Sequence, residues 1–228
     1  MTRSAHGERL VVATTNRGKL DELRALLRDV AVDVTSVRDV LGEAPHVVED
    51  GATFAENAVK KARAAAEATQ TLSLADDSGL EVDVLGGRPG VLSARFAHAH
   101  ATDAENNAAL LAALDEALRA DPRQSHAPGD ATFRARFRCV LALVDPATLG
   151  GRPALVEGVC EGAITRTARG SGGFGYDPLF VVAGTGRTMA ELDPDEKNRV
   201  SHRARAFAAL RPALEQVFAE RKQVARRG

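Results

Sequence analysis

Two adjacent aspartates followed by a glycine-rich segment are the residues in this sequence that first point to chemistry. Asp76 and Asp77 follow a short apolar run, residues 72–75, that predicts a buried strand, and Ser78 comes next. Because side chains alternate faces along a strand, one aspartate can face a ligand while the other braces the turn. Carboxylates at a strand end beside glycines suit Mg²⁺, which prefers oxygen ligands. An ordinary polar turn uses the same residue types, so this stretch alone leaves both interpretations open.

A polar segment between a predicted strand and a predicted helix is the second candidate. Residues 9–13 have the pattern of a strand, and apolar residues recur at helical spacing from Leu20 to Val30. A helix start offers N–H groups and the positive end of its dipole, which favour a phosphate, and Lys19 adds a full charge. The alternative is an ordinary strand–helix turn with a solvated lysine. The segment consists of Thr14, Thr15, Asn16, Arg17, Gly18 and Lys19.

A loop with four glycines between Gly170 and Gly175 is the third candidate. Glycines let the backbone come close to a ligand. The loop carries Phe174 and Tyr176, followed by Asp177, in a chain that has one tyrosine and no tryptophan. Aromatic residues at such a place indicate a stacking surface for a flat ligand such as a nucleobase. The alternative is a hairpin tip with its aromatic rings folded onto the core.

Three cationic side chains crowd the predicted start of the last helix. Lys197, His202 and Arg203 surround Ser201, which can cap that helix. Cations are unfavourable at a helix start because the dipole is already positive there, so an anionic ligand is one explanation and a plain basic surface is the other. Pro212 lies inside the same helix and is expected to kink or split it.

The remaining elements must position these segments. Thr53 with Glu56, and Thr102 with Glu105, have the spacing of capping boxes that begin two further helices, the first running to about residue 69. Glu49, just before the first of these helices, is a candidate second metal carboxylate, although most polar residues there are solvated. Strands are predicted at residues 32–37, 131–144, 153–165 and 178–182, with loops at 39–50 and 121–130 and a hairpin turn at 145–152.

Composition limits the classes of function. The chain of 228 residues is 44% apolar and 27% charged, as in globular proteins of one large or two small domains. A net charge of −1 argues against a general nucleic-acid or membrane binder. Cys139 and Cys160 lie in apolar runs and are expected to be reduced. We find no signal peptide and no long apolar stretch, and therefore expect a cytoplasmic protein.

Five segments, in this order, resemble the inosine triphosphate pyrophosphatase family, whose members are also called XTP/dITP diphosphatases. The segments are ATTNRGKLDEL from Ala13, EDGATFAENAVKKA from Glu49, LADDSGLEVDVLGGRPGVLSARF from Leu74, GGFGYDPLF from Gly172 and AELDPDEKNRVSHRARA from Ala190. Thr15 departs from the pattern, because many members carry a glycine or another small residue there. The resemblance implies an α/β fold with a long mixed central sheet flanked by helices, and two lobes with a nucleotide cleft between them. It also implies one two-lobed domain over residues 9–221, between flexible tails at 1–8 and 222–228.

The resemblance further implies an activity and roles for the candidate residues. The expected enzyme is a Mg²⁺-dependent homodimer that hydrolyses ITP, dITP and XTP to the monophosphate and pyrophosphate. Asp77 is expected to be the general base and a metal ligand, Glu49 a further metal carboxylate, and Lys19 a catalytic cation within a triphosphate-binding segment, Thr14 to Lys19. Contacts to the nucleotide are expected from Ser78, Phe174, Gly175, Tyr176, Asp177, Lys197, His202 and Arg203. Whether Glu49 or Asp76 completes the metal site stays open.

Two other functions are compatible with parts of the sequence. A Maf-type nucleotide pyrophosphatase shares the architecture and prefers pyrimidine or modified nucleotides, but the Ser201-His202-Arg203 segment and the Phe174–Asp177 loop favour the first family. A nucleotide-binding module without turnover is the second alternative. The presence of Asp77, Lys19 and Glu49 together argues against it.

Overall fold

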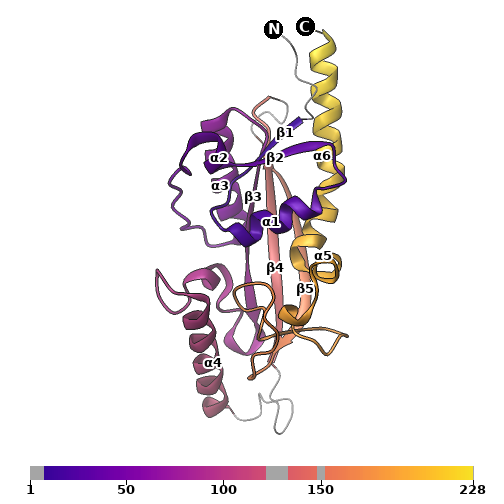
Figure 1. The fold of residues 1–228 in the computed structure, drawn as a ribbon. Helices are drawn as coiled ribbons and strands as arrows, with labels where there is room; N and C mark the ends of the chain where they lie inside the picture. The colour runs from indigo at the N-terminus through magenta and orange to yellow at the C-terminus, as the bar shows by residue number, and fades with distance from the viewer. Residues whose placement is uncertain (1–7, 122–132, 148–151, 228) are drawn as a thin grey trace. The chain divides into compact units, whose positions relative to one another are not determined.

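The computed structural model describes residues 8–121, 133–147 and 152–227, and Figure 1 shows their helices and strands. The chain divides into two compact units. The first unit contains residues 1–77, 140–157 and 206–228, and the second contains residues 78–139 and 158–205. The loop expected at 121–130 and the middle of the turn expected at 145–152 lie mostly outside the described residues.

A mixed six-stranded sheet flanked by helices confirms the predicted α/β class (Figure 1). Its strand order is β2-β1-β3-β4-β5-β6. β1 pairs in parallel with β2 and β3, whereas β5 pairs antiparallel with β6. The strands are β1 (Glu8–Val12), β2 (Val32–Ser36), β3 (Ser73–Val82), β4 (Phe133–Val144), β5 (Ala154–Ile164) and β6 (Phe180–Val182).

The helices begin largely where local capping signals predict them. Thr53 accepts a hydrogen bond from the Glu56 N–H, and Thr102 forms a reciprocal capping box with Glu105. The Ser201 hydroxyl accepts from the N–H of Ala204 at 3.2 Å, which confirms it as a cap. The helices are α1 (Arg17–Leu26), α2 (Val37–Leu41), α3 (Phe54–Thr69), α4 (Asp103–Ala120), α5 (Pro194–Val200) and α6 (His202–Arg227), with 3₁₀ turns η1 (Asp83–Leu85), η2 (Gly90–Arg95) and η4 (Met189–Glu191).

Three features differ from the sequence-based expectations. Helix α2 occupies residues expected to form a strand end and a loop, because a five-residue helix capped by Ser36 is too short to show periodicity. Helix α6 is continuous through Pro212, so the prediction that this proline splits the helix is wrong. Its buried face, which includes Leu210 and Leu214, holds both halves in place. Residues 222–227, expected to be a tail, lie within α6.

The parallel strands of the first unit determine which loops meet. From β1 the chain crosses through α1 to β2, and from β2 it returns through α3 to β3 on the other side of β1. Right-handed crossovers in opposite directions put α1 and α3 on opposite faces of the sheet. The carboxyl ends of β1 and β3 are therefore a topological switch point, where ligands bind in open α/β sheets.

Each unit has buried apolar packing of its own. Small side chains on α3, including Ala58, Ala62 and Ala65, are buried in the first unit, so the helix lies close to its neighbours. In the second unit Phe133, Phe180 and other apolar side chains form a core that also includes Cys160. Cys139 and Cys160 are both buried free thiols.

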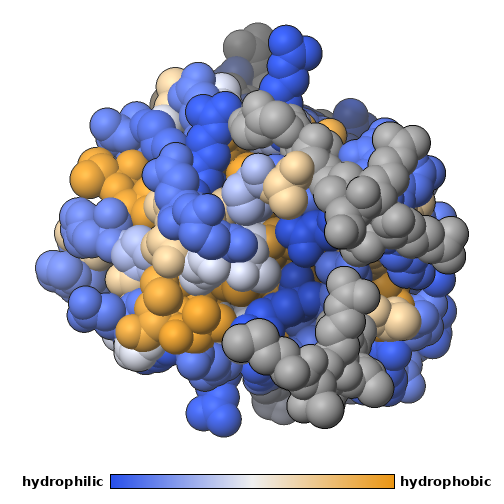
Figure 2. Space-filling model, turned by 90° about the horizontal axis from the view of Figure 1, so that it is seen from above, coloured by the Kyte–Doolittle hydropathy of each residue, from blue (hydrophilic) through white to orange (hydrophobic). Residues whose placement is uncertain are grey.

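One face of the protein is mainly polar. Figure 2 shows a face on which hydrophilic side chains predominate and hydrophobic areas are separate from one another. Exposed large hydrophobic residues include Val40, Leu41 and Val48 in the first unit and Leu92 in the second. Across the described residues, the helices are too short or too polar to cross a membrane.

Candidate active site

Asp76 and Asp77 lie within β3 rather than after it. The strand continues to Val82, so the prediction that the aspartates follow a strand end is wrong for β3 itself. The partner strand β1, however, ends at Val12, which pairs with Leu74. The two aspartates therefore lie just beyond the last parallel pair, level with the loop that follows β1. They occupy the switch-point edge of the parallel strands, although a polar turn was an open alternative.

Asp76 is paired with the lysine of the segment after β1. The Lys19 Nζ lies 3.0 Å from Asp76 Oδ2, and the Asp76 side chain is only 1% exposed. Lys19 is in the first turn of α1, and the pair joins that helix start to β3. The structure thus brings together two of the four sequence-based candidates, the aspartates and the polar segment before α1.

The polar segment forms a well-capped helix start. Helix α1 begins at Arg17, three residues earlier than the apolar pattern predicts. The Asn16 Oδ1 accepts from the Lys19 N–H at 3.0 Å, and the Thr14 hydroxyl accepts from the Asn16 N–H at 3.2 Å. The N–H groups of Arg17 and Gly18 have no partner within the helix, as in any first turn. They and the helix dipole leave this end suited to an anion.

Asp77 is held by Asn57 and Lys61 of α3, neither of which was among the predicted site residues. Its Oδ1 accepts from the Lys61 Nζ at 2.8 Å, and its Oδ2 accepts from the Asn57 Nδ2 at 3.3 Å. The Asn57 Oδ1 also accepts from the Gly51 N–H at 2.8 Å, which ties the loop before α3 to the site. Asn57 and Lys61 lie four residues apart beside the alanine face, and that spacing was the available signal.

For both Asp77 and Lys61, burial and the neighbouring opposite charges shift the pKa in opposite directions. Burial raises the pKa of Asp77 above its usual value, and the Lys61 ammonium opposes that rise only in part. Burial lowers the pKa of Lys61, but the carboxylates of Asp77, Asp76 and Glu49 outweigh it and leave that pKa above its usual value. Lys61 is therefore charged at neutral pH. A buried carboxylate of raised pKa beside a fixed cation is suited to take a proton from water.

The carboxylate oxygens around Lys61 are of the kind that bind a hard divalent cation. The Lys61 Nζ bonds Glu49 Oε2 at 3.0 Å as well as Asp77, so a cation already lies between these two carboxylates. Mg²⁺ usually takes one or two carboxylates and completes its shell with waters and substrate phosphates, which this pair fits. The part of the chain that the structure describes contains no group of three or more His, Cys, Asp or Glu side chains that could hold a metal.

The glycine-rich loop of the second unit separates its two aromatic residues. Tyr176 is buried and donates from its hydroxyl to the Ser93 carbonyl at 2.8 Å, whereas Phe174 is half-buried. The Lys197 Nζ lies 5.0 Å and the Arg203 Cζ 5.7 Å from the centroid of the Phe174 ring. Of the two aromatic rings, only that of Tyr176 is folded onto the core, as the alternative interpretation of this loop predicted for both.

The cations expected at the start of the last helix are buried. The Lys197 Nζ bonds Asp177 Oδ2 at 2.7 Å, and the Arg203 Nη2 donates to the Ser78 hydroxyl at 3.1 Å. The His202 ring stacks on Phe137, with the centroids 4.8 Å apart. A plain basic surface, the alternative interpretation, is therefore wrong. In the second unit the structure brings Phe174, Asp177 and Lys197 together with Arg203 and Ser78.

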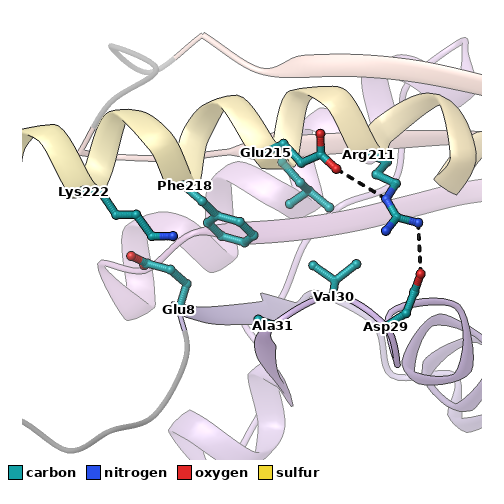
Figure 3. Close-up of a pocket in the computed structure, with 9 residues that line it drawn as sticks. Glu8, Asp29, Val30, Ala31, Arg211, Glu215, Phe218 and Lys222 are labelled. Carbon is teal, nitrogen blue, oxygen red and sulfur yellow. Dashed lines mark hydrogen bonds and ion pairs between the residues drawn. The ribbon is translucent and has the colours of Figure 1, made fainter.

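A cavity of about 480 Å³ lies elsewhere in the first unit, beside α6 (Figure 3). Its lining contains none of the candidate site residues. The Arg211 guanidinium there bonds Asp29 Oδ2 at 3.0 Å and Glu215 Oε1 at 3.4 Å. The lining residues are Glu8, Asp29, Val30, Ala31, Arg211, Leu214, Glu215, Phe218 and Lys222.

Comparisons with known proteins cover most of the chain. A family model described as the Ham1 family matches residues 10–213. A dITP/XTP pyrophosphatase of Desulforamulus reducens is 49% identical over 210 residues, which are 92% of this chain and 97% of the relative. One of Geobacillus kaustophilus is 48% identical over 209 residues, covering 91% and 95%.

The chain is also similar to solved structures of such proteins. A HAM1 protein from Coxiella burnetii aligns with a TM-score of 0.77 at 41% identity, over 92% of this chain and 99% of that one. A nucleoside-triphosphatase, dITP/XTP pyrophosphatase, from Mycobacterium abscessus aligns with a TM-score of 0.66 at 45% identity, over 89% and 98%.

Proposed function

Because this chain belongs to the Ham1 family, we propose that it hydrolyses dITP, ITP and XTP to the nucleoside monophosphate and pyrophosphate. Its relatives named dITP/XTP pyrophosphatases share nearly half of its residues over more than nine tenths of its length. The observation that carries the proposal is the buried charge cluster of the first unit. There Asp77 bonds Lys61, and Asp76 bonds Lys19 at the start of α1.

The cluster supplies the groups that attack on an α-phosphorus requires. Asp77 orients a water molecule and accepts its proton as the water oxygen bonds the α-phosphorus, and pyrophosphate leaves. The ammonium groups of Lys19 and Lys61 have further donors besides those bonded to carboxylates, and they offset the negative charge of the phosphates. The first-turn N–H groups of α1 bind phosphate oxygens. Thr14, Thr15, Asn16, Arg17 and Gly18 thus form the triphosphate-binding segment.

Mg²⁺ is the proposed cofactor, with Asp77 and Glu49 as its protein ligands. When bound, it adds positive charge against the phosphate oxygens and favours departure of pyrophosphate. The Asp76 side chain is 1% exposed, whereas that of Glu49 is 38% exposed and accessible to an ion with its waters, which favours Glu49 as the second carboxylate. Lys61, which bonds both Asp77 and Glu49, keeps these two side chains near each other.

The second unit carries the groups proposed to hold the base and sugar-phosphate. Phe174 is half-buried and available for stacking, with Lys197 and Arg203 beside its ring. Hypoxanthine and xanthine present an acceptor O6 beside a donor N1–H, whereas adenine presents the reverse. A donor such as Arg203 or a loop N–H pairs with O6 but meets the adenine amine donor to donor. Gly175, Tyr176, Asp177, His202 and Ser78 complete the proposed binding set.

Measurement of pyrophosphate release over a nucleotide panel tests the function. We expect kcat/KM for ITP and XTP to exceed that for ATP and GTP by at least about tenfold, since a site built for hydrogen bonds can discriminate by roughly 10⁴. A kcat/KM for ATP or GTP within tenfold of that for ITP would refute the proposed preference for non-standard purines. A preference for pyrimidine nucleotides would indicate the Maf-type alternative. The absence of pyrophosphate release from every nucleotide would indicate a binding module without turnover.

Arg203 variants test which part of the substrate this residue contacts. Arg203 is 1% exposed, so Arg203→Ala is compared with Arg203→Lys, which retains the charge, and unfolding is measured for both. A larger loss for ITP, XTP and GTP, which share the O6 acceptor, than for ATP supports base recognition by Arg203. Equal losses for all nucleotides would instead assign it to phosphate or sugar.

The proposal extends to the assembly and location of the enzyme. The resemblance to the pyrophosphatase family supports a homodimer that works in the cytoplasm on nucleoside triphosphates. Sedimentation equilibrium of the full chain tests the first part, and a mass equal to one chain at micromolar concentration would refute it. Fractionation of cells tests the second part.

A further inference from the structure

Helix α4 holds one residue of the glycine-rich loop from both sides. The Gly175 N–H donates to the Asp103 Oδ2 at 2.6 Å, and the Asn107 Nδ2 donates to the Gly175 carbonyl at 3.0 Å. Asp103 and Asn107 are four residues apart and so lie on the same face of α4. Both polar groups of a single loop residue are thus fixed by side chains of one helix.

Gly175 depends on these two bonds for its orientation. Its φ of +62° is in the left-handed region, and a Cβ built on it would meet nothing within 4 Å. No side chain of its own anchors this residue, so its orientation depends on the two hydrogen bonds. Its neighbour Phe174 is the half-buried ring of the loop, and the Phe174 N–H donates to Asp177 Oδ2 at 3.0 Å. A shift of Gly175 would move Phe174 directly.

The start of α4 is itself firmly anchored. Asn106, which is 3% exposed, accepts from the Ala97 N–H at 3.0 Å and donates to the Ala94 carbonyl at 3.2 Å. The reciprocal capping box of Thr102 and Glu105 fixes the first turn. Helix α4 is therefore a rigid reference against which the loop can be held.

From these contacts we infer that Asp103 and Asn107 are positioning residues for nucleobase recognition, acting through Gly175 on the placement of Phe174. The inference rests on the proposed function for its consequence, which is tighter and more selective binding of ITP and XTP. Neither side chain is placed against the substrate. Their loss should therefore raise KM and reduce base selectivity while kcat changes little.

Tyr176 provides a readout that is independent of activity. It is the only tyrosine in a chain without tryptophan, so intrinsic fluorescence reports on the residue next to Gly175. Its ring is buried, and acrylamide should quench it poorly in the wild type. The variants are Asn107→Leu, which keeps the size and removes the donor, and Asp103→Ala. Asp103→Asn keeps an acceptor oxygen, and Glu116→Ala, on an exposed part of α4, is the control.

We expect Asn107→Leu and Asp103→Ala to raise KM for ITP about three- to tenfold, as the loss of one hydrogen bond predicts. The ratio of kcat/KM for ITP to that for ATP should fall, kcat should stay within about twofold, and Tyr176 should become easier to quench. Asp103→Asn should lie between wild type and Asp103→Ala, since it retains an acceptor.

Two results would overturn the inference. In the first, Asn107→Leu and Asp103→Ala match Glu116→Ala in KM, in the ITP/ATP ratio and in quenching. In the second, all nucleotides lose kcat equally together with thermal stability, which is the sign of a structural role alone. If the wild type releases no pyrophosphate from ITP, the proposed function fails, whereas unchanged quenching in the variants shows separately that α4 does not position the loop.

Discussion

The buried pair of Lys61 and Asp77 allows a quantitative test of the site. The two side chains are 14% and 10% exposed, and their charged atoms are 2.8 Å apart. We consider Lys61→Met, Asp77→Asn and the double variant. Methionine retains most of the length of lysine without its charge, and asparagine retains one oxygen of the carboxylate.

The two single changes should not have independent effects on stability. Lys61→Met leaves the Asp77 carboxylate buried without its cation, and breaking such a pair costs about 3–5 kcal/mol of unfolding free energy. Asp77→Asn removes a charge-assisted hydrogen bond from Lys61, which contributes about 1.5–3 kcal/mol to stability. Lys61 keeps its ion pair with Glu49. The double variant removes both charges. Its loss of unfolding free energy should therefore be smaller than the sum of the two single losses by about 1–3 kcal/mol. Asp77→Asn should also reduce turnover on the order of 10²–10⁴-fold, and the double variant should not recover it.

Urea unfolding and pyrophosphate release, measured on the same four proteins, provide the assay. Lys60→Met is a matched control, because Lys60 directly precedes Lys61 in α3 and its ion pair with Asp50 is exposed. This control should unfold and turn over as the wild type does. Additive losses, with a coupling below about 0.5 kcal/mol, would show that Lys61 and Asp77 do not act as a pair. Asp77→Asn with activity within about threefold of wild type would exclude Asp77 as the base.

The remaining predictions concern the metal, the tyrosine and one glycine. EDTA should abolish activity and Mg²⁺ restore it, since Glu49 and Asp77 are oxygen donors, and full activity after dialysis against EDTA would contradict the metal assignment. Burial, and then the Asp103 carboxylate, raise the pKa of Tyr176 above 10.0, so its phenolate absorbance should stay absent in the native protein at pH 10 and develop in urea. The stabilising contribution of Tyr176 should be complete below that pH and be lost as the pH rises through the raised pKa. Gly79→Ala should destabilise the second unit by about 1–3 kcal/mol, because its Cβ would lie 2.4 Å from Ser93 Oγ and 2.5 Å from the Gly90 carbonyl; an unchanged urea midpoint would contradict it.

Features that depend on a few neighbouring residues were predictable. The caps at Thr53, Thr102 and Ser201 follow from side-chain groups that bond an N–H three residues away, and the structure contains all three. The helical and strand patterns gave the element types for the same reason. Helix α2 was missed because five residues carry too little pattern.

Asp76 and Asp77 show where local reasoning stops. Aspartate, serine and glycine favour turns, yet the chain stays extended through them to Val82. Lysines from α1 and α3 make that possible, since a buried carboxylate is tolerated when it is paired. A charge partner contributed by another element overrides the turn preference of the residue itself.

The sequence by itself determined the element types, the helix starts and the residue types of the site, because capping bonds and periodicity act within a turn or two of the chain, and the family resemblance implied the α/β class. Tertiary structure decided which of those residues meet. Lys61 reaches Asp77 across sixteen positions, and Asn107 reaches Gly175 across sixty-eight. No local preference encodes such contacts. They exist because burying the apolar faces of α3 and α4 fixes these helices, and their polar side chains are then placed against whichever strand or loop lies beside them.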